Sequence, residues 1–158
     1  MKNKKQIEQY LQEIKEISDN ISREDIDKAI ELLFDAWKND NQVFICGNGG
    51  SAGTATHFMC DLFKVTIVEG KKRFRAICLN DNIPLMTALI NDNGFDNLFI
   101  EQLKNLFRKG DILMCLSVHG GSGKDKAGLC LRGKVSQAFI HHLCNGVAPH
   151  FALALGER

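Results

Sequence analysis

The feature that most constrains this chain is the glycine-rich stretch Gly47-Asn48-Gly49-Gly50-Ser51, which follows an apolar run and precedes a helical pattern. Glycines adopt backbone angles closed to other residues and let main-chain N–H groups approach a ligand. Ser51 either caps the following helix or offers its hydroxyl to a ligand. Because free N–H groups and the positive end of the helix dipole converge there, the stretch predicts a phosphate site. A plain tight turn is the simpler alternative.

Length, charge and cysteine content narrow the class of protein. The chain has 158 residues, of which 44% are hydrophobic, so we expect one globular domain with a core of its own. Its 20 basic and 19 acidic residues are scattered, which predicts a small-molecule ligand and neither nucleic acid nor a membrane as partner. No apolar run reaches the ~18 residues of a membrane span, so we expect a cytoplasmic protein. The six cysteines form no C-x-x-C pair, and neither disulfides nor a cysteine zinc site is expected.

The N-terminal part of the chain has helical periodicity. Residues 1–40 contain two amphipathic patterns separated near position 20 and predict two helices arranged as a hairpin. Ser22, followed three residues later by Asp25, is typical of a helix cap. The pattern leaves open whether these helices pack on a sheet or form an oligomer contact.

Strand and helix patterns then alternate. We expect strands at residues 43–46, 74–79 and 112–116, separated by helices at 52–63, 83–90 and 95–106, with Pro84 in a first turn. This order predicts an α/β fold with a doubly wound parallel sheet, whose ligands bind at the carboxyl ends of the strands. A second polar glycine loop, residues 117–123, follows the third strand, so both glycine loops lie at such ends.

With both loops placed, residues 21–128 resemble the SIS (sugar isomerase) domain family, and within it the phosphoheptose isomerases of lipopolysaccharide precursor biosynthesis. The resemblance rests on three motifs in order: residues 47–51 with His57 and an acid at 61, residues 91–95, and residues 110–122. It implies an SIS-type, flavodoxin-like three-layer sandwich that binds a sugar phosphate. It also implies isomerisation of sedoheptulose 7-phosphate through an enediolate, and a homodimer or homotetramer. The alternative is a non-catalytic or incomplete SIS module that only binds a sugar phosphate.

The resemblance also implies the substrate-binding residues. Residues of the second loop, helped by Ser51, would hold the phosphate, while residues of the first loop and of the middle motif would face the sugar. The full set is Asn48, Gly49, Gly50, Ser51, Asn91, Asp92, Ser117, Val118, His119 and Ser122. The family usually has Ser at the position of His119, so His119 either donates to phosphate or fills the loop.

His57 and Asp61 lie four residues apart, which places both on one helix face where they can share a metal or a substrate. Two unrelated polar groups are the alternative. The resemblance implies that His57 and Asp61 are catalytic and bind one divalent metal, zinc, per site, although the acid is usually Glu. Asp61 is the best candidate for the base that moves a proton next to a carbonyl. The family completes its site with a late Gln and His, for which the chain offers Gln137 with His141 or His142 in surroundings that do not match.

Two further expectations concern a cofactor and the end of the chain. The spacing Gly47-x-Gly49-x-x-Ala52 fits a relaxed dinucleotide fingerprint, but the acid expected about twenty residues on is missing, so no nucleotide cofactor is expected. We divide the single domain into N-terminal helices (1–40), a sugar-phosphate-binding core (41–129) and a divergent tail (130–158). The tail matches neither pattern nor family, and we predict that it does not complete the usual sheet.

Overall fold

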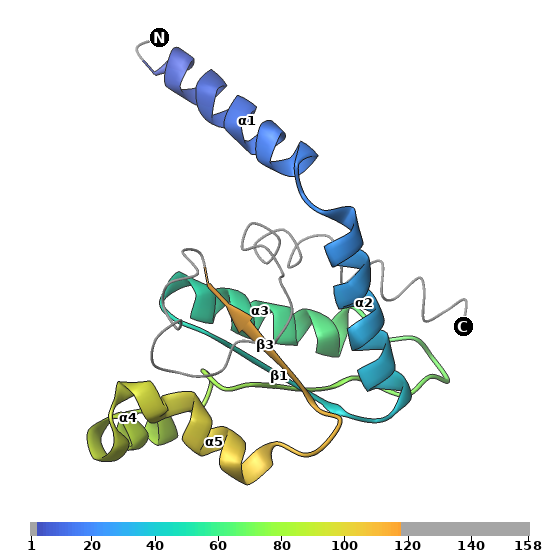
Figure 1. Ribbon diagram of the computed structural model, residues 1–158, viewed down its shortest axis with the longest axis vertical. Helices are drawn as coiled ribbons and strands as arrows, with labels where there is room; N and C mark the ends of the chain where they lie inside the picture. Colours follow the sequence, from blue (N-terminus) through green and yellow to red (C-terminus); the bar gives the residue numbers. More distant parts are fainter. Residues whose placement is uncertain (1–2, 118–158) are drawn as a thin grey trace.

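The computed structural model describes residues 3–117, which form five α-helices, one 3-10 helix and three strands (Figure 1). In chain order the elements are α1 Lys4–Asp19, α2 Arg23–Lys38, β1 Gln42–Gly47, α3 Gly50–Lys64, β2 Arg75–Cys78, α4 Ile83–Asn93, η1 Phe95–Asn97, α5 Leu98–Leu106 and β3 Ile112–Leu116. The predictions made for Val118, His119, Ser122, Gln137, His141, His142 and the tail at 130–158 lie outside the described residues.

The three described strands form a parallel sheet in the order β2-β1-β3. Val43 of β1 lies opposite Ala76 on one side and Ile112 on the other, and Gly47 pairs with Leu116 at the carboxyl end. The chain leaves β1 through α3 to reach β2, then crosses through α4 and α5 to β3 on the other side of β1. This reversal is the topological switch of a doubly wound sheet, and the predicted fold class is confirmed.

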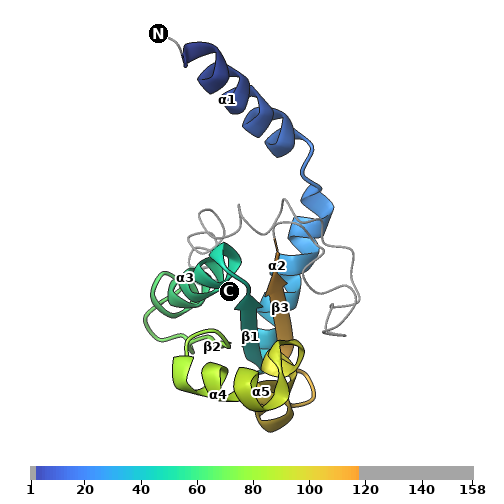
Figure 2. The same cartoon turned by 90° about the vertical axis from the view of Figure 1, so that its left-hand side faces the viewer.

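Helices cover both faces of the sheet. Alternate β1 residues point in opposite directions, so Val43 and Ile45 join a core with α2 and α3, whereas Phe44 and Cys46 join a second core with α5. Figure 2 shows α3 on one side of β1 and the pair α4 and α5 on the other. Burial on both faces explains why the β1 sequence is continuously apolar. Each such large side chain contributes about 1.5–3 kcal/mol on full burial.

The two N-terminal helices behave differently. The Ser22 hydroxyl oxygen accepts a hydrogen bond from the Asp25 N–H at 3.1 Å, which confirms the predicted cap of α2. Helix α2 packs on the sheet through its buried residues, whereas α1 buries none and extends away from the α/β core instead of folding back as a hairpin (Figure 1). The large exposed apolar side chains of α1 are Ile7, Tyr10, Leu11 and Ile17.

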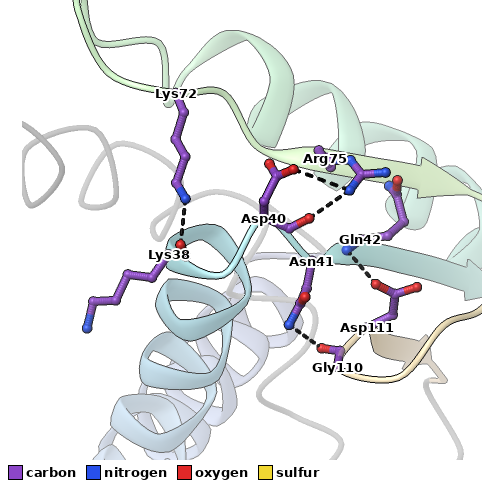
Figure 3. A network of polar contacts seen from close by, with 8 residues as sticks. All are labelled: Lys38, Asp40, Asn41, Gln42, Lys72, Arg75, Gly110 and Asp111. Carbon is purple, nitrogen blue, oxygen red and sulfur yellow. Dashed lines mark hydrogen bonds and ion pairs between the residues drawn. The ribbon is translucent and has the colours of Figure 1, made fainter.

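Polar contacts join the amino-terminal ends of the strands, at the end of the sheet opposite the glycine loop (Figure 3). The Arg75 guanidinium donates to the Asp40 carbonyl at 2.7 Å, which joins the start of β2 to the chain before β1. The Gln42 N–H donates to an Asp111 carboxylate oxygen at 2.8 Å, which joins β1 to the segment before β3. The three strands are thereby held in register at the end away from the predicted site.

No helix between residues 3 and 117 combines the length and apolarity needed to cross a membrane.

Candidate functional site

The glycine loop joins the end of β1 directly to α3. Gly49 occupies the N-cap position with φ 55° and ψ −123°, a conformation that side-chain-bearing residues rarely adopt. Ser51 lies inside α3, and no side chain makes the cap hydrogen bond. Of the two roles predicted for Ser51, capping is therefore wrong, because the backbone conformation needed at the cap favours glycine over serine, and offering its hydroxyl to a ligand stays a prediction.

Gly47 is required for a different reason, which is close packing. A Cβ atom at this position would lie 2.4 Å from both the carbonyl carbon and the carbonyl oxygen of Ser51, and 2.8 Å from the Ala52 nitrogen. The backbone of the strand therefore touches the first turn of the helix. This contact places the start of α3 directly at the carboxyl end of β1.

The loop places two exposed glycines, Gly49 and Gly50, at the positive end of α3. The Ser51 N–H donates to the Asn48 carbonyl and the Ala52 N–H donates to the Gly49 carbonyl, both at 3.0 Å. Gly49 and Gly50 are exposed, and their N–H groups have no acceptor among residues 3–117. Free N–H groups at a helix N-terminus are suited to binding an anion, and phosphate is the commonest.

The second loop begins beside the first. Leu116 pairs with Gly47, so Ser117, half-buried, follows β3 at the level of Asn48. Ser51 is only 9% exposed and lies on the sheet-facing stripe of α3. The convergence of Ser51, Ser117 and Ser122 on one anion stays a prediction, because Ser122 lies outside the described residues.

His57 and Asp61 lie on one face of α3, as their spacing predicts. The His57 Nε2 is 3.7 Å from an Asp61 carboxylate oxygen, with the histidine side chain 64% exposed and the aspartate 16% exposed. Their helical stripe also contains Gly50 and Thr54, so it starts at the glycine loop. A partly shielded carboxylate beside an exposed imidazole offers a proton acceptor on the same stripe of α3 as the start of the glycine loop.

The described part of the site does not by itself hold a zinc ion. Zinc sites in proteins take about three or four protein ligands, and His57 and Asp61 supply two. Within residues 3–117, no group of three His, Cys, Asp or Glu side chains is placed to hold a metal. A metal bound there would need further ligands from elsewhere.

Asn91 and Asp92 lie in the last turn of α4, which extends three residues beyond its predicted end. Both are exposed, and the Asn91 amide donates to an Asp92 carboxylate oxygen at 2.8 Å. Helix α4 lies with α5 on the face of the sheet opposite α3 (Figure 2). The hydrogen bonds of the described residues join neither side chain to His57 or to the glycine loop.

Two cysteine side chains meet beneath the loops. The Cys46 and Cys115 sulfur atoms are 3.5 Å apart, on directly paired positions of β1 and β3. The neighbouring Cys115 thiol and burial raise the pKa of the Cys46 thiol, and burial likewise raises the pKa of Cys78. Cys46 and Cys78 are therefore protonated core residues near neutral pH and are poor nucleophiles.

Sequence reasoning missed Asn80, which contacts the loop directly. Its side chain makes two hydrogen bonds to Gly47, one to the N–H and one to the carbonyl, both at 2.9 Å. In the sequence, Asn80 is only the residue that follows the strand predicted at 74–79. A signal was present, because Asn80 is a polar amide directly after a predicted strand. The neighbour of that strand in a parallel sheet is the strand that leads into the glycine loop.

The parallel sheet, with two loops meeting at its switch point, defines an α/β domain of the class that binds small ligands at the carboxyl ends of its strands. The model of the family described as "SIS domain" matches residues 9–125. This match covers well over half of the sequence, and the chain belongs to the SIS domain family.

Curated relatives match the chain over part of their length. It is 48% identical over 92 residues to the lincomycin biosynthesis protein LmbN of Streptomyces lincolnensis, covering 58% of this chain and 34% of that protein. It is 38% identical over 100 residues to a phosphoheptose isomerase of Shewanella sp. (strain ANA-3), covering 63% of this chain and 50% of the relative. The chain therefore spans between a third and a half of the length of these two relatives.

Solved structures share the fold. The phosphoheptose isomerase GmhA from Neisseria gonorrhoeae superposes with a TM-score of 0.75 at 22% identity, covering 100% of both chains. A phosphoheptose isomerase from Francisella tularensis superposes with a TM-score of 0.72 at 20% identity, covering 99% of this chain and 97% of the other. At sequence identities this low, the two superpositions show a common fold alone.

Proposed function

We propose that this protein is a sugar-phosphate isomerase that converts sedoheptulose 7-phosphate to an aldoheptose 7-phosphate in the cytoplasm. The observation that carries the proposal is the arrangement along α3. The N–H groups of the exposed Gly49 and Gly50 lie at its start, and His57 with Asp61 follows on the stripe that begins at Gly50. We place the phosphate at these N–H groups, whereas the resemblance alone implies that the second loop holds the phosphate and the first loop faces the sugar. Relatives that bear the name phosphoheptose isomerase support this choice of substrate.

The spacing on α3 suits a sugar phosphate. A helix rises about 1.5 Å per residue, so His57 lies roughly 10 Å along the axis from Gly50. The open carbon chain between the phosphate and the carbonyl of a ketoheptose phosphate spans a comparable length. With phosphate at the loop, the carbonyl end of the substrate therefore comes to the level of His57, whose Nε2 lies 3.7 Å from an Asp61 carboxylate oxygen. Asn48, Ser51, Asn91, Asp92, Ser117, Val118, His119 and Ser122 complete the proposed substrate-binding set.

The proposed reaction moves one proton between neighbouring carbons. The Asp61 carboxylate removes a proton from C1, which gives an enediolate, and returns a proton to C2 while the hydroxyl proton passes from O1 to O2. His57, 3.7 Å from that carboxylate, orients it and shuttles the hydroxyl proton. We further propose zinc or another divalent ion at His57 and Asp61 with its other ligands from outside residues 3–117. No step above depends on that ion, and no nucleotide cofactor is required.

We also propose that the protein assembles as a homodimer or homotetramer. Four large apolar side chains of α1 are about half exposed or more, and α1 buries no residue of its own. An amphipathic helix gains most of its stability from packing its apolar face, so a second copy is the natural cover for this stripe. Light scattering coupled to size exclusion measures the assembly directly.

A non-catalytic module that only binds a sugar phosphate is the second candidate. Such a module needs the exposed Gly49 and Gly50 of the glycine loop and neither His57 nor Asp61. Both candidates share the glycine loop and differ in whether substrate is turned over.

Turnover of sedoheptulose 7-phosphate by the purified protein separates the two, with Asp61→Asn as the test variant. We expect turnover by the unmodified protein and a loss of about 2–4 decades in the variant, with binding retained, because only the base is removed. Asp27→Asn, an exposed carboxylate on α2, is the matched control and should retain full activity. Binding without turnover by the unmodified protein would assign the non-catalytic role, and the absence of both would refute sugar-phosphate recognition.

A further inference from the structure

Asn80 holds the residue from which the glycine loop begins. Its Oδ1 accepts from the Gly47 N–H and its Nδ2 donates to the Gly47 carbonyl, each at 2.9 Å. Gly47 is buried and Asn80 half-buried, so both hydrogen bonds are partly shielded from water. An amide side chain suits this contact because it presents one acceptor and one donor side by side, as a peptide group does. The reverse orientation would set oxygen against oxygen at the Gly47 carbonyl.

The Asn80 side-chain amide makes the hydrogen bonds to Gly47 that the backbone of a neighbouring strand would otherwise make. The β1–β2 pairing ends at Ile45 and Cys78, and the Leu79 N–H then donates to the Ile45 carbonyl at 2.9 Å. After Leu79 the backbone turns toward α4, while the Asn80 side chain continues the hydrogen bonding as far as Gly47. On its other side Gly47 pairs with Leu116 of β3. Gly47 is therefore held from both neighbouring strands at the point where β1 ends.

The same turn also touches the helix that follows the loop. The Thr56 hydroxyl of α3 donates to an Asp81 carboxylate oxygen at 2.6 Å. Asn80 and Asp81 thus contact the strand before the loop and the helix after it. Because the exposed Gly49 and Gly50 lie between these two anchors, their orientation depends on the anchors.

We propose that Asn80 is a positioning residue that keeps the Gly49 and Gly50 N–H groups arranged to bind an anion. The identity of that anion as the phosphate of a sugar phosphate rests on the proposed function. The positioning itself depends only on the two contacts to Gly47. Asn80 touches the loop backbone and acts on the ligand through it.

The test compares Asn80→Ala and Asn80→Asp with a matched control, Asn82→Ala. Asn82 belongs to the same turn and its side chain accepts from the Leu85 N–H at 3.1 Å, so its loss weakens the α4 cap and leaves the Gly47 contacts in place. Three quantities are measured on the full chain: hydrogen exchange at the Gly47 amide, the dissociation constants for sedoheptulose 7-phosphate and inorganic phosphate, and the urea midpoint.

Asn80→Ala should speed exchange at the Gly47 amide and weaken both ligands by about tenfold, the scale of losing neutral hydrogen bonds. Asn80→Asp keeps an acceptor for the Gly47 N–H and loses the donor, so much of the protection should remain while affinity falls. Asn82→Ala should lower the urea midpoint and leave exchange at Gly47 and both affinities unchanged. If Asn80 contributed only to overall stability, Asn80→Ala and Asn82→Ala would instead weaken both ligands equally.

Exchange at Gly47 or affinity that is unchanged in Asn80→Ala would overturn the proposal. Failure of the proposed function has a different signature, because the unmodified protein would then bind sedoheptulose 7-phosphate without turning it over, or would not bind it at all. In that case the Gly47 exchange rates of Asn80→Ala and Asn82→Ala still decide whether Asn80 holds the loop.

Discussion

Replacing Gly47 by alanine tests the close contact between β1 and α3. The added Cβ would stand 2.4 Å from the Ser51 carbonyl carbon and oxygen, and these are backbone atoms that no rotamer change can move. Ordinary contact between such atoms begins near ~3.5 Å, so the strand and helix must separate by about 1 Å. Overpacking of this kind costs about 3 kcal/mol, and a shift of this size at the loop should weaken phosphate binding as well.

Gly53→Ala is the matched control for Gly47→Ala. Gly53 lies in α3 and its added Cβ would meet nothing within 4 Å, so alanine there should raise the free energy of unfolding by about 0.5–1 kcal/mol. Urea unfolding followed by circular dichroism, at one protein concentration for all variants, measures both changes. The reasoning is refuted if Gly47→Ala unfolds within about 0.5 kcal/mol of the unmodified protein.

Two further predictions concern the cap of α2 and the thiols. Ser22→Ala removes the acceptor for the Asp25 N–H and should lower the free energy of unfolding by about 1 kcal/mol in the same urea assay; an unchanged midpoint would contradict the cap. With a thiol-specific alkylating reagent at pH 8, peptide mapping should find Cys60, which is exposed, labelled before Cys46 and Cys78. Cys46 and Cys78 should react only after denaturation, because both side chains are buried and the pKa of each thiol is raised; rapid labelling of either in the folded protein would contradict their burial.

The strands could be predicted from the sequence because each contains mostly apolar residues, most completely β1, which is buried on both faces. Residues 112–116 were predicted with the bounds that β3 has. Helix α4 was predicted too short, since its polar Asn91 and Asp92 end the apolar pattern before the helix ends. Helix α4 buries no residue anywhere, so packing gives no further signal for its last turn.

The details of the loop were harder to predict. Capping statistics favour Ser51, but the chain reaches the cap with a positive φ at Gly49, which depends on how closely β1 meets α3. The contact of Asn80 with Gly47 depends on the register of two strands separated by a whole helix. The pairing of His57 with Asp61 was predictable because it needs only helical spacing.

The central claim is that the N–H groups of the exposed Gly49 and Gly50 at the start of α3 bind the phosphate of a sugar phosphate. A titration of the isotopically labelled protein with sedoheptulose 7-phosphate, followed by amide NMR, tests it most directly. The Gly49 and Gly50 amide resonances should shift most, and sedoheptulose without phosphate should leave them in place. Binding of sedoheptulose 7-phosphate that leaves both glycine amides unchanged would contradict the account.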